Sequence, residues 1–447
     1  MADKYGERAV PTGRAGRLWG LGSLIGNIGI SVAAAGAGQV LRGQPLNLSE
    51  LLSSPSNALK LADKLAHMRG AAMKLGQMLS MDAGQLLPPE WSPILSRLQA
   101  DALPMPAHQL DAQLSRYWGS SWRQQFETFS DKPIAAASIG QVHKARTHDG
   151  RELAIKVQYP GVRDSIDSDI DNLLAVMRTA RLVPPELNID AIVQEARQQL
   201  HEEADYLREA AQIKRYRALV AGDDSLLVPD VDDGLTREGV LAMTFNESQP
   251  IERVIAFGQQ ARNQIVERLV RLVLQEIFEF GCVQTDPNFA NFRYQPSTKR
   301  IVLLDFGATR SVSPELSGKL AALLQAALSG NREAQRAAML DIGYFRPEQE
   351  RLAHFALELL GMVMDAVNAT PEFDFAALDL PTRARDKAFT LGFGSDLWSI
   401  PPAEALFVHR KIGGMYLLAS RLQARVNVRA LLEYYSSATP IRSVVAD

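Results

Sequence analysis

Residues 133–158 constrain the fold most, because they read as a β-hairpin in a chain whose other long segments have helical periodicity. The run "SIGQVHKARTHDGRELAIKV" contains two strand-like pieces, and the turn residues "HDG" at 148–150 separate them. A strand-rich part of the molecule is therefore predicted to begin near residue 133.

The rest of the chain is expected to be mainly helical. Helical patterns before residue 220 cover 48–100, 107–118, 163–182 and 189–219. Two more strand-like pieces lie within 225–245. From residue 251 the pattern is helical again, with one interruption that holds a loop, a hairpin and an apolar strand at 301–304. A strand-rich lobe followed by a helical lobe is typical of a bilobed, α+β nucleotide-binding enzyme.

Composition excludes several classes of function. The chain of 447 residues is 46% hydrophobic with a formal net charge of -3, without the basic excess of a nucleic-acid-binding protein. Its single cysteine, Cys282, excludes a disulfide framework and is interpreted as a buried residue without chemistry. The histidines are scattered and form no zinc-type cluster with it.

Residues 18–41 form an uncharged segment between Arg17 and Arg42. As a helix of about 1.5 Å per residue, the segment could cross roughly 30 Å of hydrocarbon. Gly22 and Gly26 form a G-x-x-x-G pair, which favours close packing of membrane helices. Its many Gly, Ala, Ser and Asn residues also fit a flexible linker or a soluble helix. We expect a segment that touches a membrane or self-associates, with those two alternatives left open.

The stretch "IAAASIGQV" at 134–142 fits the frame of the glycine-rich phosphate loop of protein kinases, G-x-G-x-x-G-x-V. Alanines occupy the first two glycine positions and only Gly140 is retained. An alanine Cβ crowds the approach of backbone N–H groups to phosphates, so we expect a restrained nucleotide loop. The candidate contacts to ATP are Ala135, Ala136, Ala137, Ser138, Ile139, Gly140 and Val142, with Met243 from a later strand-like piece.

Further motifs follow in the order of a kinase active site. Lys156 ends the apolar run "LAIK", where a lysine reaches the α- and β-phosphates of ATP. Asp286 and Asn291 in "TDPNFAN" have the spacing of the kinase catalytic loop, and Asp305 follows an apolar strand in "LLDFG". Asp286 is thus a candidate base, and Asn291 and Asp305 are candidate Mg²⁺ ligands. Each motif alone is weak, but their order is specific.

In these motifs the chain resembles the UbiB/AarF family of atypical kinase-like ATPases, and particularly its coenzyme Q biosynthesis branch. The shared motifs are "KLGQ" at 74–77, "AAASIGQVHKA", "EADYLREA" at 203–210, "QTDPNFANF" and "LLDFGATR". The likeness extends to "HRKIGG" at 409–414, which we interpret as a packing motif. The resemblance implies a bilobed protein-kinase-like fold with a small β-rich N-lobe, a helical C-lobe and an N-terminal helical extension packed over the cleft.

The resemblance also implies ATP and Mg²⁺ as cofactors, ATPase activity, and support of ubiquinone synthesis at membranes. The predicted domains are a Gly/Ala-rich, membrane-associating segment (1–45), a helical extension with the K-x-G-Q motif (46–131), a kinase-like N-lobe with inserted helices (132–248) and a helical C-lobe (249–447).

Four polar residues outside the phosphate-binding motifs are assigned through the resemblance. Lys74 and Gln77 share a helix face, and the resemblance implies that they cover the cleft, although a solvated patch would look the same. Glu203 is the candidate partner of Lys156 or Lys74. Asp205, which cannot share the face of Glu203 in a regular helix, is assigned with Lys74 and Gln77 to the regulatory, cleft-covering set, and a solvated role for it stays open. The rival acids for the lysine are Glu195, Glu202 and Glu209.

Two departures from ordinary kinases favour ATP hydrolysis or a small-molecule or lipid substrate over a protein substrate. Gln284 and Thr285 replace the histidine and arginine of the kinase catalytic motif, so a phosphorylated activation loop would lack its usual partner. The helical pattern also resumes by Pro314, which leaves little chain for docking a peptide. The alternatives are a nucleotide-gated, lipid-binding scaffold without turnover and, third, a true protein kinase.

The expected partners are ATP, a lipid or quinone precursor, enzymes of quinone biosynthesis and a membrane surface, with no nucleic acid and a homodimer left open. No convincing transit peptide is present. The expected location is therefore the bacterial cytoplasm, peripheral at the inner membrane. The alternative is the matrix side of the mitochondrial inner membrane.

Overall fold

The computed structural model describes residues 104–179, 190–286, 288–377, 379–380, 382–383 and 402–437. They fall into two compact units, and each is described by itself. Unit 1 holds the described residues up to Lys214 together with Asp230–Phe245, and unit 2 holds Arg215–Pro229 and the chain from Asn246 onward. The predictions for 18–41 and 48–100, including Lys74 and Gln77, lie outside the described residues.

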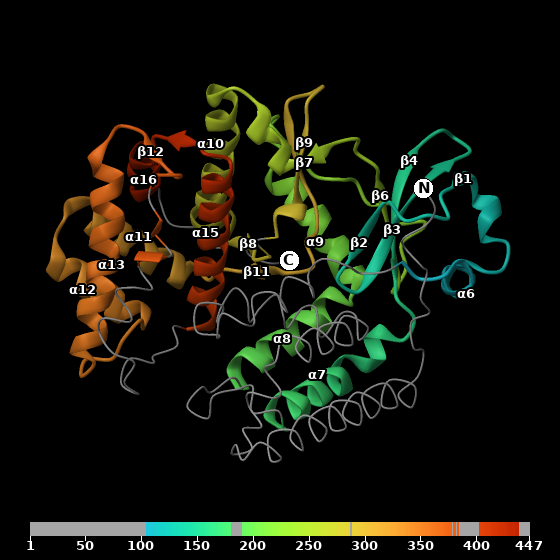
Figure 1. Ribbon diagram of the computed structural model, residues 1–447, viewed down its shortest axis with the longest axis horizontal. Helices are drawn as coiled ribbons and strands as arrows, with labels where there is room; N and C mark the ends of the chain where they lie inside the picture. The colour runs from blue at the N-terminus through green and yellow to red at the C-terminus, as the bar shows by residue number, and fades with distance from the viewer. Residues whose placement is uncertain are drawn as a thin grey trace, which may run out of the picture. The chain divides into compact units, whose positions relative to one another are not determined.

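An antiparallel sheet forms the centre of unit 1 (Figure 1). Its strands follow the order β1–β3–β4–β6, and β2 pairs with β3. The hairpin predicted at 133–158 is confirmed, because β3 and β4 pair in register around the predicted turn. The strand bounds are β1 (Phe126–Phe129), β2 (Ala135–Ala137), β3 (Gly140–Thr147), β4 (Glu152–Gln158) and β6 (Val240–Thr244).

Strand β4 is almost fully covered, since only its first residue is exposed. The predicted helix at 107–118 is α6 (Ala107–Trp118), and it packs against β4. The Gln113 side-chain amide donates to the Gln158 carbonyl at 3.1 Å. Trp122 is fully buried beside β1, with its ring edge-on to Phe129 at 4.8 Å between centroids. Buried apolar area of this kind is the main stabilising contribution to the unit.

The single helix predicted over 189–219 is wrong in its middle. The structure has α8 (Asp190–Glu203) and α9 (Tyr206–Leu219), preceded by α7 (Val162–Thr179). Asp205 explains the break, because its Oδ1 accepts a hydrogen bond from the Arg208 backbone N–H at 3.0 Å. Aspartate in this role is a favoured helix N-cap. Residues of α9 therefore do not continue the face periodicity of α8.

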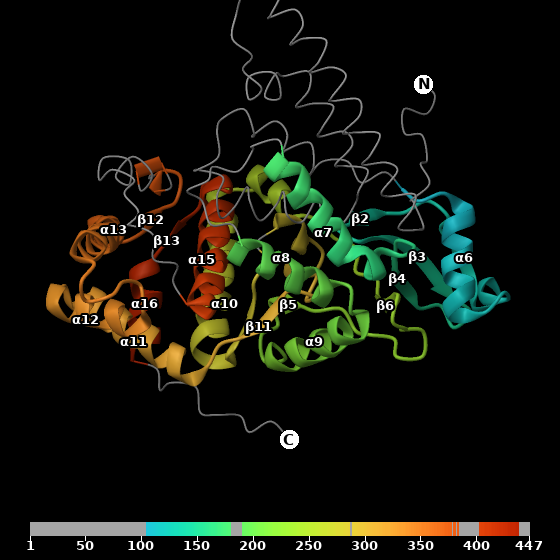
Figure 2. The ribbon, with the colours of Figure 1, turned by 90° about the horizontal axis from the view of Figure 1, so that it is seen from below.

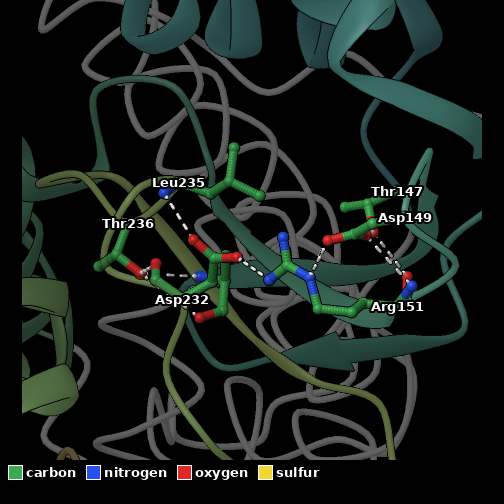
Figure 3. Close-up of polar contacts among 7 residues, drawn as sticks. Thr147, Asp149, Arg151, Asp232, Leu235 and Thr236 are labelled. Carbon is green, nitrogen blue, oxygen red and sulfur yellow. Dashed lines mark hydrogen bonds and ion pairs between the residues drawn. The ribbon is translucent and has the colours of Figure 1, made fainter.

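The β3–β4 turn is fastened to the chain before β6 by a polar cluster on the surface (Figure 3). Arg151 donates to Asp149 Oδ2 at 2.7 Å and to Asp232 Oδ2 at 2.5 Å. The Thr147 hydroxyl also donates to Asp149. Asp232 in turn accepts the Leu235 N–H at 3.1 Å. The hydrogen bonds from Thr147 and Arg151 lower the pKa of the Asp149 carboxyl to about 2, and the Thr147 hydroxyl is the largest cause.

Two small sheets of unit 2 position its loops. The larger has the order β5–β10–β9–β7, and the smaller pairs β8 with β11. The apolar strand and hairpin predicted around 301–304 are confirmed as β10 and β9, in which Ile301 lies opposite Tyr294. The bounds are β5 (Leu226–Leu227), β7 (Gln249–Pro250), β8 (Cys282–Gln284), β9 (Phe292–Gln295), β10 (Arg300–Leu303) and β11 (Thr309–Ser311).

Helices make up most of the rest of unit 2 (Figure 2). Their bounds are α10 (Gln259–Gln275), α11 (Pro314–Ser329), α12 (Arg332–Ile342), α13 (Glu350–Ala369), α15 (Ala403–Arg421) and α16 (Val428–Ser436), with a short pair of strands, β12 (Phe373–Asp374) and β13 (Arg425–Val426). Helix α10 runs into a π-helical turn, Glu276–Phe280, which ends at the left-handed Gly281. Both ribbon views place α15 beside α10, which it contacts.

Helix α13 is, within the described residues, the one helix whose length and apolar composition would suffice to cross a membrane. Leu357 and Leu360 on this helix pack against the cluster of Met339, Phe345 and Ala353. Length and composition alone are weak evidence for a span, and these contacts tie the helix to its neighbours in unit 2.

The lowered pKa of Asp149 predicts how the β3–β4 turn responds to pH. A carboxyl whose pKa is lower in the folded state stabilises the protein above the unfolded pKa, near 3.8, and this contribution is lost as pH falls toward about 2. We expect Asp149→Asn to lower the melting temperature at pH 7, and the difference from the unaltered protein to shrink between pH 4 and pH 2. A difference that stays constant with pH would contradict the prediction.

Candidate active site

Lys156 lies inside β4, and its ammonium forms a buried ion pair with Glu209. Its Nζ is 2.9 Å from both carboxylate oxygens of Glu209, and the two side chains are only 8% and 1% exposed. The ring of Tyr206 lies 5.1 Å from the same Nζ. Two contacts from one carboxylate in a buried site hold the ammonium in one place. The strand and the helix therefore fix the position of the Lys156 ammonium.

The partner of Lys156 corrects the sequence prediction. The sequence favours Glu203 as the partner of Lys156 or Lys74, with Glu209 among the rival acids. In the structure Glu203 ends α8, where its Oε2 accepts the Ser138 hydroxyl at 2.7 Å. The new helix that Asp205 caps places Glu209 in its first turn. An aspartate N-cap signal within the supposed long helix could have revealed this arrangement from the sequence.

The alanine-rich stretch forms a tight β-hairpin. Ala135 pairs with Val142 and Ala137 pairs with Gly140, which leaves Ser138 and Ile139 as the two turn residues. The turn is fixed on its unit, because the Ile139 side chain is 1% exposed and its carbonyl accepts the Tyr159 N–H at 2.9 Å. The Ser138 contact to Glu203 adds a third anchor. The loop is thus a braced hairpin.

Gly140 is needed because the backbone of β4 lies too close for a side chain. A Cβ built at this residue would lie 2.4 Å from the Val157 carbonyl oxygen and 2.8 Å from the Tyr206 hydroxyl. Its φ is not in the left-handed region, so space and not backbone conformation demands glycine here. Gly140, the glycine retained from the kinase motif, therefore allows β3 and β4 to pack closely in the sheet.

This close contact predicts a specific loss of stability. Gly140→Ala should lower the free energy of unfolding by about 1–3 kcal/mol, because a backbone oxygen cannot move aside as a flexible side chain can. Gly222→Ala is the matched control, since nothing lies within 4 Å of a Cβ at that residue. Urea denaturation of both variants tests the prediction. Equal stability of the two variants would show that the strands separate easily.

Unit 2 brings Asp286, Asn291 and Asp305 together. The Asn291 amide donates to the Asp286 carbonyl at 3.4 Å, and the Asn291 carbonyl accepts the Leu304 N–H at 2.8 Å. Asp286 Oδ1 accepts the Asn288 N–H at 3.2 Å, which orients its carboxylate. The catalytic-loop and "DFG" motifs that were predicted separately are therefore neighbours in space.

Asp305 has an unusual backbone, with φ of 61°. A non-glycine residue adopts this left-handed conformation rarely, and it persists where the surroundings fix it. Locally, Asp305 Oδ1 accepts the Gly307 N–H at 3.2 Å. The Gln284 side chain also donates to the Asp305 carbonyl at 3.1 Å.

The residues of unit 2 fit a magnesium ion that phosphate oxygens would help to hold. Within the described residues, no three Asp, Glu, His or Cys side chains form a closed metal cage. Asp305 offers a carboxylate, and because the Asn291 amide nitrogen is engaged, its amide oxygen is the atom left to face a cation. Mg²⁺ commonly takes one or two protein carboxylates or amides and completes its octahedron with phosphate and water.

The chain after Asp305 is short, as expected. Residues 306–313 connect it to α11, and β11 within them pairs with β8. Thr285, at the position of the kinase arginine, is buried and donates its hydroxyl to the Ala308 carbonyl at 2.6 Å. A neutral hydroxyl bound to backbone therefore replaces the cation that would recognise a phosphorylated loop.

The remaining predicted contacts lie in the sheet of unit 1. Val142 is half-buried on β3 opposite Lys156, and Met243 is 8% exposed on β6 opposite Ala154. Their roles toward a nucleotide remain predictions. Lys156 and Glu209 belong to unit 1, whereas Asp286, Asn291 and Asp305 belong to unit 2.

Comparison with known proteins matches this chain to atypical kinase-like proteins. A family model described as the ABC1 atypical kinase-like domain matches residues 97–339. The Saccharomyces cerevisiae protein named atypical kinase COQ8, mitochondrial, is 35% identical, and the alignment covers 96% of this chain and 86% of the relative. The Danio rerio protein named atypical kinase COQ8B, mitochondrial, is also 35% identical, with 98% and 71% covered.

A solved structure extends the similarity to three dimensions. It is the complex of Rv3197 with erythromycin from Mycobacterium tuberculosis, which aligns with a TM-score of 0.58 at 25% sequence identity. The alignment covers 85% of this chain and 95% of the other.

Proposed function

This chain belongs to the ABC1 atypical kinase-like family, and on that premise we propose that it is an ATP-dependent atypical kinase or ATPase that supports ubiquinone biosynthesis. The observation that carries the proposal is the buried pair of Lys156 and Glu209, with Nζ 2.9 Å from both oxygens. A strand lysine held by a helix glutamate is the arrangement with which kinases bind the α- and β-phosphates of ATP.

The proposed roles follow from the geometry of each unit. Lys156 binds phosphate as a fixed point charge, and Glu209 keeps it oriented. Asn291 and Asp305 would hold Mg²⁺, which when bound neutralises phosphate charge. Asp286, whose carboxylate the Asn288 N–H orients, accepts a proton from water or a substrate hydroxyl.

Hydrolysis of ATP, or transfer to a small molecule or lipid, is the reaction we propose. The short link from Asp305 to α11 offers little chain for a peptide platform, and Thr285 cannot pair with a phosphorylated loop. A nucleotide-gated scaffold without turnover is the rival. The retained set of Asp286, Asn291 and Asp305 favours turnover, since a scaffold would not need a base and metal ligands together.

The setting of this activity is also proposed. A lipid or quinone precursor, enzymes of quinone biosynthesis and a membrane surface are the partners that suit this function, and a homodimer is left open. Peripheral attachment at a bacterial inner membrane is the location expected from the sequence. The relatives named as mitochondrial support the alternative, the matrix side of the mitochondrial inner membrane.

Loss of the metal ligand provides the main test of the proposed function. Asp305→Asn should lower Mg²⁺-dependent ATP turnover by about 100-fold or more, because it removes the one negative charge among the proposed ligands and so weakens binding of the cation. Asp341→Asn is the control, since the side chain of this exposed aspartate of α12 makes a long, 3.7 Å ion pair with Lys319. Turnover that survives Asp305→Asn would exclude the assignment, and tight ATP binding without turnover by the unaltered chain would favour the scaffold.

The two alanines of the hairpin provide a second test. Ala135→Gly or Ala137→Gly should change ATP affinity several-fold or release autophosphorylation, because removal of each methyl group frees the backbone beside the turn. Binding titrations and phosphate transfer assays measure both effects. If both variants match the unaltered protein, the alanines serve only packing.

A further inference from the structure

The left-handed Asp305 also accepts a hydrogen bond from outside its own segment. Gln284 lies at the end of β8, is 4% exposed, and donates from Nε2 to the Asp305 carbonyl at 3.1 Å. Its position is that of the histidine in the kinase catalytic motif. An amide side chain can point either its oxygen or its nitrogen at a neighbour. Something must therefore keep the nitrogen facing Asp305.

Lys411 supplies this constraint. Its Nζ lies 3.3 Å from Gln284 Oε1, and the ammonium is only 2% exposed on α15. An ammonium has donors and no acceptor, so it binds the amide oxygen and turns the amide NH₂ toward Asp305. Lys411 belongs to the segment "HRKIGG", for which the sequence offered only a packing role.

Glu276 fixes the lysine in turn. Its Oε2 is 3.0 Å from Lys411 Nζ, and its side chain is fully buried where α10 gives way to the π-helical turn. Oε1 accepts the Tyr216 hydroxyl at 2.8 Å and the Gln284 backbone N–H at 3.0 Å. Burial, with the Glu276 charge as a second cause, raises the pKa of Tyr216, so its hydroxyl stays a donor. Glu276 thus holds Gln284 in two ways: it accepts the Gln284 backbone N–H, and it fixes Lys411, which binds the Gln284 side chain.

A purely stabilising role does not explain these charges well. Removing two ions from water costs much of what their attraction returns, and well-packed apolar residues often serve stability equally well. A buried charged network is better suited to specifying one arrangement of the atoms around it.

We propose that Lys411 is a positioning residue that, with Glu276, orients the Gln284 amide and thereby holds the Asp305 backbone in its left-handed conformation. The inference rests on the proposed function only in that Asp305 is the proposed Mg²⁺ ligand. It adds a connection from α15, far along the chain, to the backbone of the "DFG" segment.

Substitutions at Gln284 test this proposal most directly. In the full-length protein, Gln284→Leu should raise the Mg²⁺ concentration that half-saturates ATP turnover by about 10-fold, as is usual for partners that orient metal ligands. Without ligand, it should also speed hydrogen exchange of the backbone at residues 304–309. Gln284→His should restore both properties, because one ring nitrogen can accept from Lys411 while the other donates to the Asp305 carbonyl.

Lys411 is tested without leaving a buried charge. The single substitution Lys411→Met would leave the Glu276 charge buried without its cation, and such a variant can fail to fold. Lys411→Met is therefore combined with Glu276→Gln. The double variant should melt near the temperature of the unaltered protein and still show the faster exchange and the raised Mg²⁺ requirement. Gln335→Leu is the matched control, because Gln335 is also a buried glutamine that donates to a backbone carbonyl of unit 2, that of Ala326, at 3.2 Å. It should lower stability and leave both readouts unchanged.

Two results separate this proposal from the proposed function. If Gln284→Leu and the double variant change only the melting temperature, as Gln335→Leu does, the network is structural and the proposal is overturned. If the unaltered protein shows no ATP turnover, the proposed function fails, whereas hydrogen exchange at 304–309 still decides for or against the positioning role.

Discussion

The ion pair between Lys156 and Glu209 determines how unit 1 must be built. Two charges removed from water destabilise a fold unless they meet in good geometry. Strand β4 fixes the position of Lys156. The N-cap at Asp205 sets where α9 begins, one turn before Glu209, and this start directs the Glu209 carboxylate toward the lysine. One residue more or fewer between the cap and Glu209 would rotate the carboxylate away from the lysine.

Unit 2 also contains a buried ion pair, formed by Lys411 and Glu276. Lys411 and Glu276 are buried together as Lys156 and Glu209 are, but this pair acts on an amide, not on a phosphate. In both units a charge is held by a helix residue whose position depends on an irregularity, a capped break in one and a π-helical turn in the other. Helix irregularities are therefore where the proposed site obtains its precision.

The sequence predicted the order and type of the elements well, because turn residues and periodicity are local signals. The β3–β4 hairpin, α6, and the strand before Asp305 all follow from such patterns. The partner of Lys156 did not follow, since helical periodicity carries across Asp205 although the backbone does not. The contact from Lys411 to Gln284 joins residues 127 positions apart, and no local pattern records it.

The braced hairpin of residues 134–142 has a consequence for how related chains can diverge. Ala135 and Ala136 are exposed, so the sheet places few demands on them, whereas any Cβ at Gly140 would lie 2.4 Å from the Val157 carbonyl oxygen and destabilise the strand pair. Drift and selection can act freely on one arm of the hairpin and scarcely at all on the other. New nucleotide preferences should therefore arise at the alanines, over an unchanging sheet, and a lineage could gain or lose glycines there without first acquiring compensating mutations.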